Sequence, residues 1–209
     1  MYRRPSSLLP FLILLCSVLA SGQSPADAAI SGNAYTNYFF RFRYEFTASW
    51  IPLSKASKEQ VHEFTLDRFP TSCLHPDADA TTAGAQDLLT LLRKLPRSFQ
   101  GNERYAAILA VAEKLPPDGT VRNGTECAAA LSEYLQKTGY SLVGGQSELQ
   151  IGGTSFSRQD LKGTTRSGAL YQSLMYTTLR GYAVGFIVIA PNEEVLTATV
   201  NAVKRFNFF

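Results

Sequence analysis

One short segment contains a histidine and two aspartates that could bind a metal ion. His75, Asp77 and Asp79 alternate along the sequence, so an extended turn would present one nitrogen and two oxygen ligands. His62 could complete the set, and zinc accepts such ligands. Aspartates beside proline and alanine are also typical of a solvated loop, which is the commoner structure. The sequence leaves both interpretations open, and the first of them predicts a metal-dependent hydrolase.

Other catalytic arrangements lack residues that they require. A serine hydrolase uses a histidine base, and His62 and His75 are the only histidines in the chain. The segment 153–157 contains serine but lacks the second glycine of a nucleophile elbow. The glycine pairs at 144–145 and 152–153 are not followed by a helix that begins with lysine, as a phosphate-binding loop would be. We therefore expect a noncatalytic protein, with the metal-dependent hydrolase as the alternative.

The composition is that of a globular domain with little net charge. The chain has 209 residues, of which 45% are hydrophobic and 18% charged, so it can close one sizeable core. Its formal net charge of +3 falls to +1 when Arg3 and Arg4 are removed with the N-terminal leader described next. Nucleic-acid binding is driven by neutralisation of phosphates, so we expect no nucleic-acid partner.

Residues 1–22 have the pattern of a secretory signal peptide. Two early arginines provide positive charge, an apolar run extends from Leu8 to Leu19, and small residues follow. The run of about 12 residues is too short for a membrane-spanning helix, which needs about 20. We expect cleavage before Gln23, a periplasmic or secreted location, and no membrane span in the mature chain.

Two cysteines remain after the predicted cleavage, and they could form a disulfide. Cys73 and Cys127 would reach an oxidising compartment, where such bonds persist. In the alternative interpretation, Cys127 is a small buried residue on a helix and Cys73 is an unpaired thiol in a loop. Spacing does not decide between them, because a disulfide requires the two β-carbons to lie within bonding reach.

A half-buried strand is predicted between Tyr38 and Phe46. Aromatic residues occupy alternate positions there, and charged residues occupy most of the positions between them. This period of two is that of a strand with one buried face. The five aromatic residues could also form a platform for a ligand, although a sheet face covered by helices is the commoner use of such a pattern. Residues 23–34 are small and polar, and we expect a flexible leader there. The fold should begin near Tyr35 and continue as a single domain to Phe209.

The segment that follows is irregular and is the predicted recognition loop. Prolines interrupt residues 47–84, and long loops in compact domains are often functional. We therefore expect Trp50, His62 and His75 to contact a ligand or a partner.

Two apolar stretches, 87–95 and 104–114, are ambiguous. The spacing of leucine and alanine in them fits a helix as well as a buried strand. A clearer helix is predicted for residues 125–138, capped by Gly124 or Thr125.

The C-terminal half is predicted to form antiparallel strands. Glycines separate short stretches after residue 139, with a breaker expected at Gly163, and the pair Arg180-Gly181 is suited to a tight hairpin. The segment Tyr182–Ala190 is apolar on both faces, which predicts a central strand. A last helix is expected to begin at Asn192.

Four features of the sequence point to a known family. They are Tyr35-x-Asn37 before the alternating aromatics, the following Trp50, the segment Gly152-Gly153-x-x-Phe156-x-Arg158, and the strand Tyr182–Ile189 with a closing helix. In type and order these features resemble the PsbP-like family and its bacterial relatives of the DcrB and LpqN type. The resemblance implies an α+β fold in which an antiparallel β-sheet is sandwiched by helices, and it makes strands of the two ambiguous stretches.

The same resemblance carries an expectation about function. The family consists mostly of extracytoplasmic accessory or binding modules and has no shared catalytic site. We therefore expect an exported noncatalytic module that recognises a partner protein in the cell envelope or a small ligand. No cofactor is expected, and a divalent metal ion belongs only to the hydrolase alternative.

Overall fold

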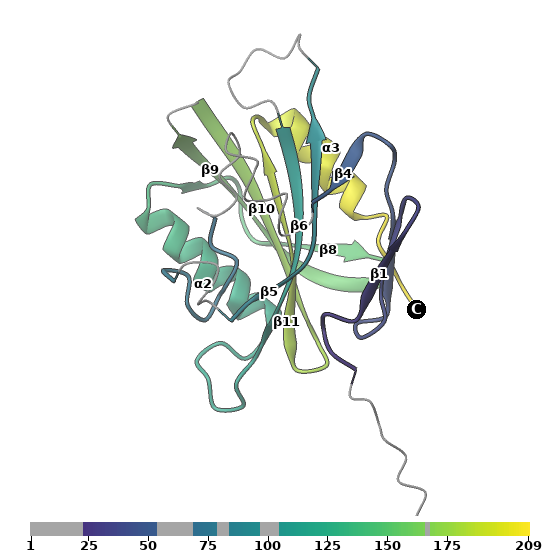
Figure 1. Ribbon diagram of the computed structural model, residues 1–209. Coiled ribbons are helices and arrows are strands. Elements are labelled where there is room, and N and C mark those ends of the chain that lie inside the picture. The colour runs from purple at the N-terminus through teal and green to yellow at the C-terminus, as the bar shows by residue number, and fades with distance from the viewer. Residues whose placement is uncertain (1–22, 54–68, 79–83, 97–104, 166–167) are drawn as a thin grey trace, which may run out of the picture.

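Figure 1 shows the computed structural model of the chain. The structure describes residues 23–53, 69–78, 84–96, 105–165 and 168–209. The predicted signal peptide, His62 and Asp79 therefore lie outside the described residues.

A large antiparallel sheet forms the centre of the fold. From edge to edge its strands are β4 (Trp50–Pro52), β5 (Gln86–Lys94), β6 (Tyr105–Lys114), β11 (Tyr182–Ala190), β10 (Gly168–Leu179), β9 (Thr154–Thr165) and β7 (Ser141–Leu142), while β8 (Ser147–Ile151) also pairs with β9. The strands expected near 87–95 and 104–114 are confirmed as β5 and β6. The central position expected for β11 is also confirmed.

A smaller sheet and two helices cover the large sheet. The smaller sheet contains β1 (Ala28–Ser31), β2 (Ala34–Asn37), β3 (Phe42–Glu45) and β12 (Asn207–Phe208). Helix α2 (Gly124–Lys137) packs against β9 and β10, whereas α3 (Glu193–Val203) packs against β11 and β6.

The central strands β6 and β11 are buried on both faces, which separates the core into two halves. Ile108 and Phe186 face a cluster that includes α3 and the aromatic residues of the smaller sheet. Leu109 and Ile187 face a second cluster, which α2 closes. An α+β fold built on antiparallel strands is thus confirmed. The sheet is not sandwiched by helices alone, as the resemblance implied, because the smaller sheet and α3 together cover one face of the large sheet.

The segment expected to be a flexible leader contains a strand. All four residues of β1 are exposed, so their side chains carry no burial pattern that a sequence could reveal. The strand is held by its backbone pairing with β2, from Ala28 opposite Asn37 to Ser31 opposite Ala34.

The strand expected from Tyr38 to Phe46 is interrupted at its beginning. The Asn37 side-chain oxygen accepts a hydrogen bond from the Phe40 backbone N–H at 2.8 Å, and Arg41 has a left-handed φ of 57°. These features make a turn between β2 and β3. The buried alternation holds from Phe40 to Phe46, but Tyr38 is exposed.

Two details of the C-terminal half also differ from expectation. Asn123, rather than Gly124 or Thr125, caps α2, because its side-chain oxygen accepts from the Glu126 N–H. Gly163 does not break β9. The ring of Tyr140 occupies the space that a side chain at position 163 would need, so this position of the strand requires glycine.

Candidate functional site

The proposed metal ligands are only partly within the described chain. His75 and Asp77 are exposed near a turn, while His62 and Asp79 lie outside the described residues. Within the ranges that the structure describes, no group of three or more His, Cys, Asp or Glu side chains is placed to hold a metal ion. The metal site therefore stays a prediction.

A buried glutamate organises the segment that precedes His75. Glu113 is 4% exposed. Its carboxylate accepts hydrogen bonds from the Ser72 hydroxyl at 2.5 Å, from the Cys73 backbone N–H at 2.7 Å and from the Leu74 N–H at 3.3 Å. Sequence reasoning missed this residue. The available signal was a single acid at the end of the apolar run of β6.

The same segment is linked covalently to α2. The sulfur atoms of Cys73 and Cys127 lie 2.07 Å apart, with 5.1 Å between the α-carbons. Both cysteines are buried. The disulfide and Glu113 together fix residues 72–74 against the face of the large sheet that α2 covers.

Trp50 lies in the core and not in a recognition loop. It is 6% exposed and belongs to β4, where it pairs with Arg93 of β5. The Arg93 guanidinium carbon lies 5.2 Å from the centre of the indole ring. Its burial in the core makes Trp50 unsuitable as a primary ligand contact.

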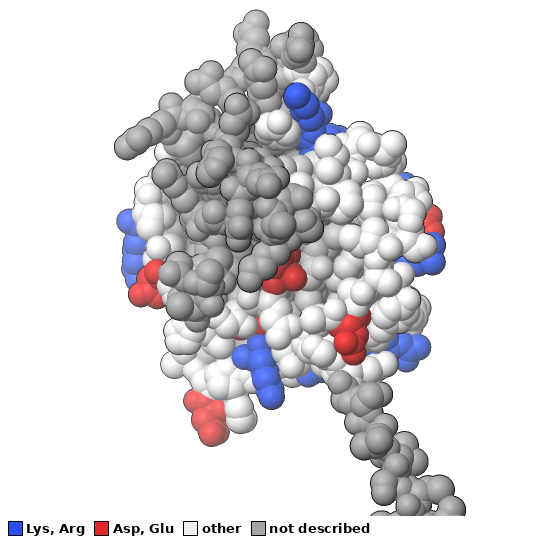
Figure 2. Space-filling model, viewed as in Figure 1, with Lys and Arg blue, Asp and Glu red and all other residues white. Residues whose placement is uncertain are grey.

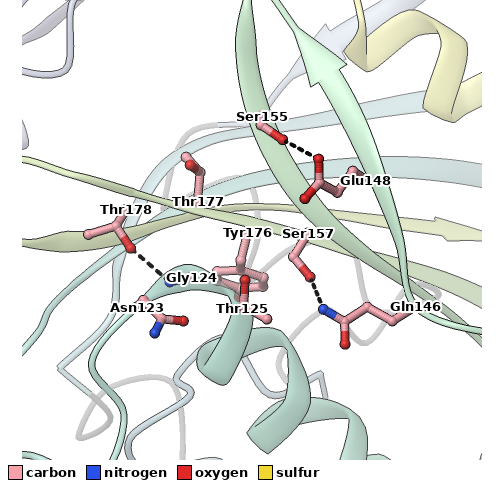
Figure 3. A pocket seen from close by; sticks show the side chains of 10 residues that line it. All are labelled: Asn123, Gly124, Thr125, Gln146, Glu148, Ser155, Ser157, Tyr176, Thr177 and Thr178. Atoms are coloured by element: carbon pink, nitrogen blue, oxygen red, sulfur yellow. Dashed lines mark hydrogen bonds between the residues drawn. The ribbon is translucent and has the colours of Figure 1, made fainter.

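The best candidate site is a polar pocket between the start of α2 and the β8–β9 hairpin (Figure 3). Its volume is about 320 Å³. Residues from the start of α2, from the hairpin and from the end of β10 line it: Asn123, Gly124, Thr125, Gln146, Glu148, Ser155, Ser157, Tyr176, Thr177 and Thr178. Most of these side chains carry a hydroxyl, amide or carboxylate group.

Close contact with β10 fixes the helix side of the pocket. A β-carbon on Gly124 would lie 2.5 Å from the backbone of Thr177, so only glycine allows this approach. The Gly124 N–H donates to the Thr178 hydroxyl at 2.8 Å. The first turn of α2 is thereby held directly against β10.

Hydrogen bonds between side chains order the hairpin side. The Gln146 amide donates to the Ser157 hydroxyl at 2.9 Å, and the Ser155 hydroxyl donates to a Glu148 carboxylate oxygen at 3.2 Å (Figure 3). Each bond uses only part of the capacity of an amide or a carboxylate. Gln146 and Glu148 therefore retain groups that a ligand could bind.

The lining offers hydrogen bonding but no activated nucleophile. Ser155, Ser157 and the threonines would need a base such as histidine to become nucleophiles. The one described histidine, His75, does not line the pocket. What these described groups offer is hydrogen bonding to a ligand.

A second pocket of about 320 Å³ lies on the outer face of the smaller sheet and is lined by Arg43, Glu45, Arg205 and Asn207. Its Arg43 and Glu45 form an exposed ion pair at 2.8 Å. Figure 2 shows positive and negative side chains interspersed on the face in view, without a field of one sign there.

Comparisons with known proteins show the fold. No protein-family model matches the chain, and no curated protein matches its sequence. The solution structure of cyanobacterial PsbP (CyanoP) from Synechocystis sp. PCC 6803 matches with a TM-score of 0.51 and 11% identity, covering 90% of this chain and 96% of that chain. The chain has a PsbP-like fold. The resemblance expected from the sequence is thus confirmed at the level of the fold.

Two further solved structures match less closely. LpqN of Mycobacterium tuberculosis, described as involved in cell envelope biogenesis, gives a TM-score of 0.49 at 12% identity and covers 79% of this chain and 82% of its own. The Ran-binding protein Mog1p of Saccharomyces cerevisiae gives 0.47 at 8% identity and covers 86% and 96%.

Proposed function

We propose that this PsbP-like chain is an exported, noncatalytic binding module that holds a small polar ligand in the pocket between α2 and the β8–β9 hairpin. The observation that carries the proposal is the lining itself. Hydroxyl, amide and carboxylate groups from three parts of the chain surround one cavity of about 320 Å³. Small-ligand sites are concave, and placed polar groups in them fix the orientation of the ligand.

Rigidity of the lining supports binding. The hydrogen bond from Gly124 to Thr178 holds the helix start, and the bond from Gln146 to Ser157 holds the hairpin. The groups that a ligand would contact are therefore already ordered, so binding costs less conformational entropy of the protein.

Export is supported by two features. Residues 1–22 carry the signal-peptide pattern, and the Cys73–Cys127 disulfide suits an oxidising compartment. Across the described ranges, no helix is both long enough and apolar enough to cross a membrane.

A thermal-shift screen tests the pocket. The probes are free amino acids, monosaccharides and dicarboxylic acids, and at least one should raise the melting temperature of the wild-type protein. The shift should be lost in Gln146→Ala and Glu148→Gln. The matched control is Gln150→Ala, an exposed glutamine of the same hairpin that does not line the pocket. Failure of every probe, or an equal shift in all variants, would contradict the proposal.

A further inference from the structure

Two turns meet at one end of the molecule and present aromatic rings together with arginines. One turn joins β2 to β3, and the other joins β10 to β11, beside the first described residues (Figure 1). We call this surface the aromatic tip and define it as Tyr38, Phe39, Arg41, Arg180 and Phe209. Tyr38 is 51% exposed and Phe209 is 58% exposed, although both are large and aromatic.

The two arginines of the tip lie against aromatic rings. The Arg180 guanidinium carbon is 5.4 Å from the centre of the Phe39 ring, and that of Arg41 is 5.8 Å from the centre of the Phe209 ring. Both arginines have a left-handed φ, 53° for Arg180 and 57° for Arg41. The turns thus hold cation and ring side by side at the surface.

The backbone and neighbouring rings support the tip from below. Phe39 packs edge-on against Tyr182, with 5.5 Å between the ring centres. The Phe209 N–H donates to the Arg41 carbonyl oxygen at 2.8 Å. The exposed rings therefore belong to an ordered surface.

The two arginines of the tip form no ion pair with the residues that the structure describes. In the described part of the chain, neither Arg41 nor Arg180 has a carboxylate within 4.0 Å, whereas Arg43, Arg122 and Arg158 each form an ion pair. A surface that combines exposed rings with unpaired cations suits a partner that is negatively charged and also accepts apolar groups. Aromatic rings and arginines occur together where proteins meet the membrane–water interface.

We infer that the aromatic tip docks on the surface of an anionic lipid bilayer. The exposed rings favour a membrane over an acidic protein, because an anionic bilayer surface offers negative charge and apolar groups together. The Asn37 amide donates to the Pro25 carbonyl oxygen at 2.8 Å, and the Tyr38 N–H donates to that of Asp27 at 2.9 Å. Residues 25–27 therefore lie beside the tip, where the exposed Asp27 carboxylate accepts a hydrogen bond from the Ser24 N–H at 2.7 Å and, among the described residues, forms no ion pair with either arginine of the tip.

Sedimentation with lipid vesicles tests the inference. The protein is purified after export, so that wild type and variants share the same N-terminus, and is mixed with vesicles of phosphatidylcholine alone or with phosphatidylglycerol. Wild type should bind only the anionic vesicles, and rising salt should release it. Arg41→Gln with Arg180→Gln should lower the partition coefficient at least about tenfold.

Two more variants make the test decisive. Lys137→Gln with Lys162→Gln removes the same charge at the C-terminal end of α2 and beside Tyr171, at the other end of β10 from Arg180, and should bind nearly as wild type. Tyr38→Ser leaves the left-handed residues Arg41 and Arg180 unchanged and should still weaken binding severalfold. No binding to anionic vesicles would overturn the inference. An equal fall of the partition coefficient in the control double variant would do the same, as would binding that does not weaken with rising salt. Binding to an acidic protein without binding to vesicles would overturn it too.

Discussion

The phenol ring of Tyr176 lies over Gly185, the residue directly opposite it on the neighbouring strand. A β-carbon at Gly185 would collide with three carbons of that ring. Tyr176 is only 1% exposed, so moving its ring would disturb the packing of the core around it. Glycine is required here by packing and not by its backbone conformation.

Gly185→Ala should therefore destabilise the protein by about 1–3 kcal/mol, the usual cost of overpacking a core. Urea denaturation measures the free energy of unfolding. Gly145→Ala is the control, because nothing lies within 4 Å of its added β-carbon. A loss in Gly185→Ala no larger than in the control would contradict the packing argument. Adding Tyr176→Leu to Gly185→Ala should relieve the collision.

Stability should fall in alkaline solution. Burial raises the pKa of Tyr176 above its ordinary value of 10.0, and the nearby charge of Glu113 raises it further. A pKa that is higher in the folded state adds stability that is fully present below about pH 10 and is lost as pH rises above it. Tyr35, Tyr44 and Tyr140 have pKa values raised by burial as well.

Tyr176→Phe isolates this effect. Within the described structure the Tyr176 hydroxyl is buried without a hydrogen-bond partner, so its removal should cost little at neutral pH. The free energy of unfolding should fall less steeply between pH 9 and pH 11 in Tyr176→Phe than in wild type. The exposed-site variant Tyr38→Phe should show the same pH dependence as wild type. If the free energy of unfolding of Tyr176→Phe also fell as steeply as that of wild type, Tyr176 would not be the source of the alkaline loss.

Loss of the disulfide should be costly. The two cysteines are 54 residues apart, and closing such a loop stabilises a fold by about 4 kcal/mol in the chain-entropy model. The double variant Cys73→Ala with Cys127→Ala should lose stability of this order in chemical denaturation. Alkylation of denatured protein checks the bond itself: neither thiol should react before reduction, and both should react after it.

Glu113→Gln should destabilise the protein by about 1–3 kcal/mol. The amide that replaces one carboxylate oxygen would face a donor, either the Ser72 hydroxyl or the backbone N–H groups of Cys73 and Leu74. Glu133→Gln is the control, because Glu133 is exposed on α2 and forms an exposed ion pair with Lys137 at 2.8 Å. Equal unfolding midpoints in urea for the two variants would show that the Glu113 contacts are dispensable.

Much of the fold could be predicted from apolar periodicity, but the ends of the elements could not. The alternation from Phe40 to Phe46 correctly marks a buried face, because it reflects packing. The turn before it depends on the hydrogen bond from the Phe40 N–H to the Asn37 side chain and on the left-handed φ of Arg41. Periodicity also left β5 and β6 undecided, because strands buried on both faces contain apolar residues at every position.

The candidate pocket was beyond sequence reasoning for a different reason. Its lining comes from segments as far apart as Asn123 and Thr178, and it consists of small polar residues that are common in any turn. Trp50 was predicted to contact a ligand because it is a tryptophan in an irregular segment, but its side chain is buried in the core. Glu113 is the reverse case, because its role depends on a distant loop that folds over it.

Strand β12 pairs with β3, which lies more than 160 residues earlier in the sequence. Phe208 lies opposite Phe42, and the ring of Phe206 stacks on that of Tyr44 with 4.0 Å between the ring centres. During synthesis the smaller sheet is therefore complete only after residues 206–208 have emerged. Until then Tyr44 lacks the ring that stacks on it, and this half of the core stays incomplete however early its other strands have paired.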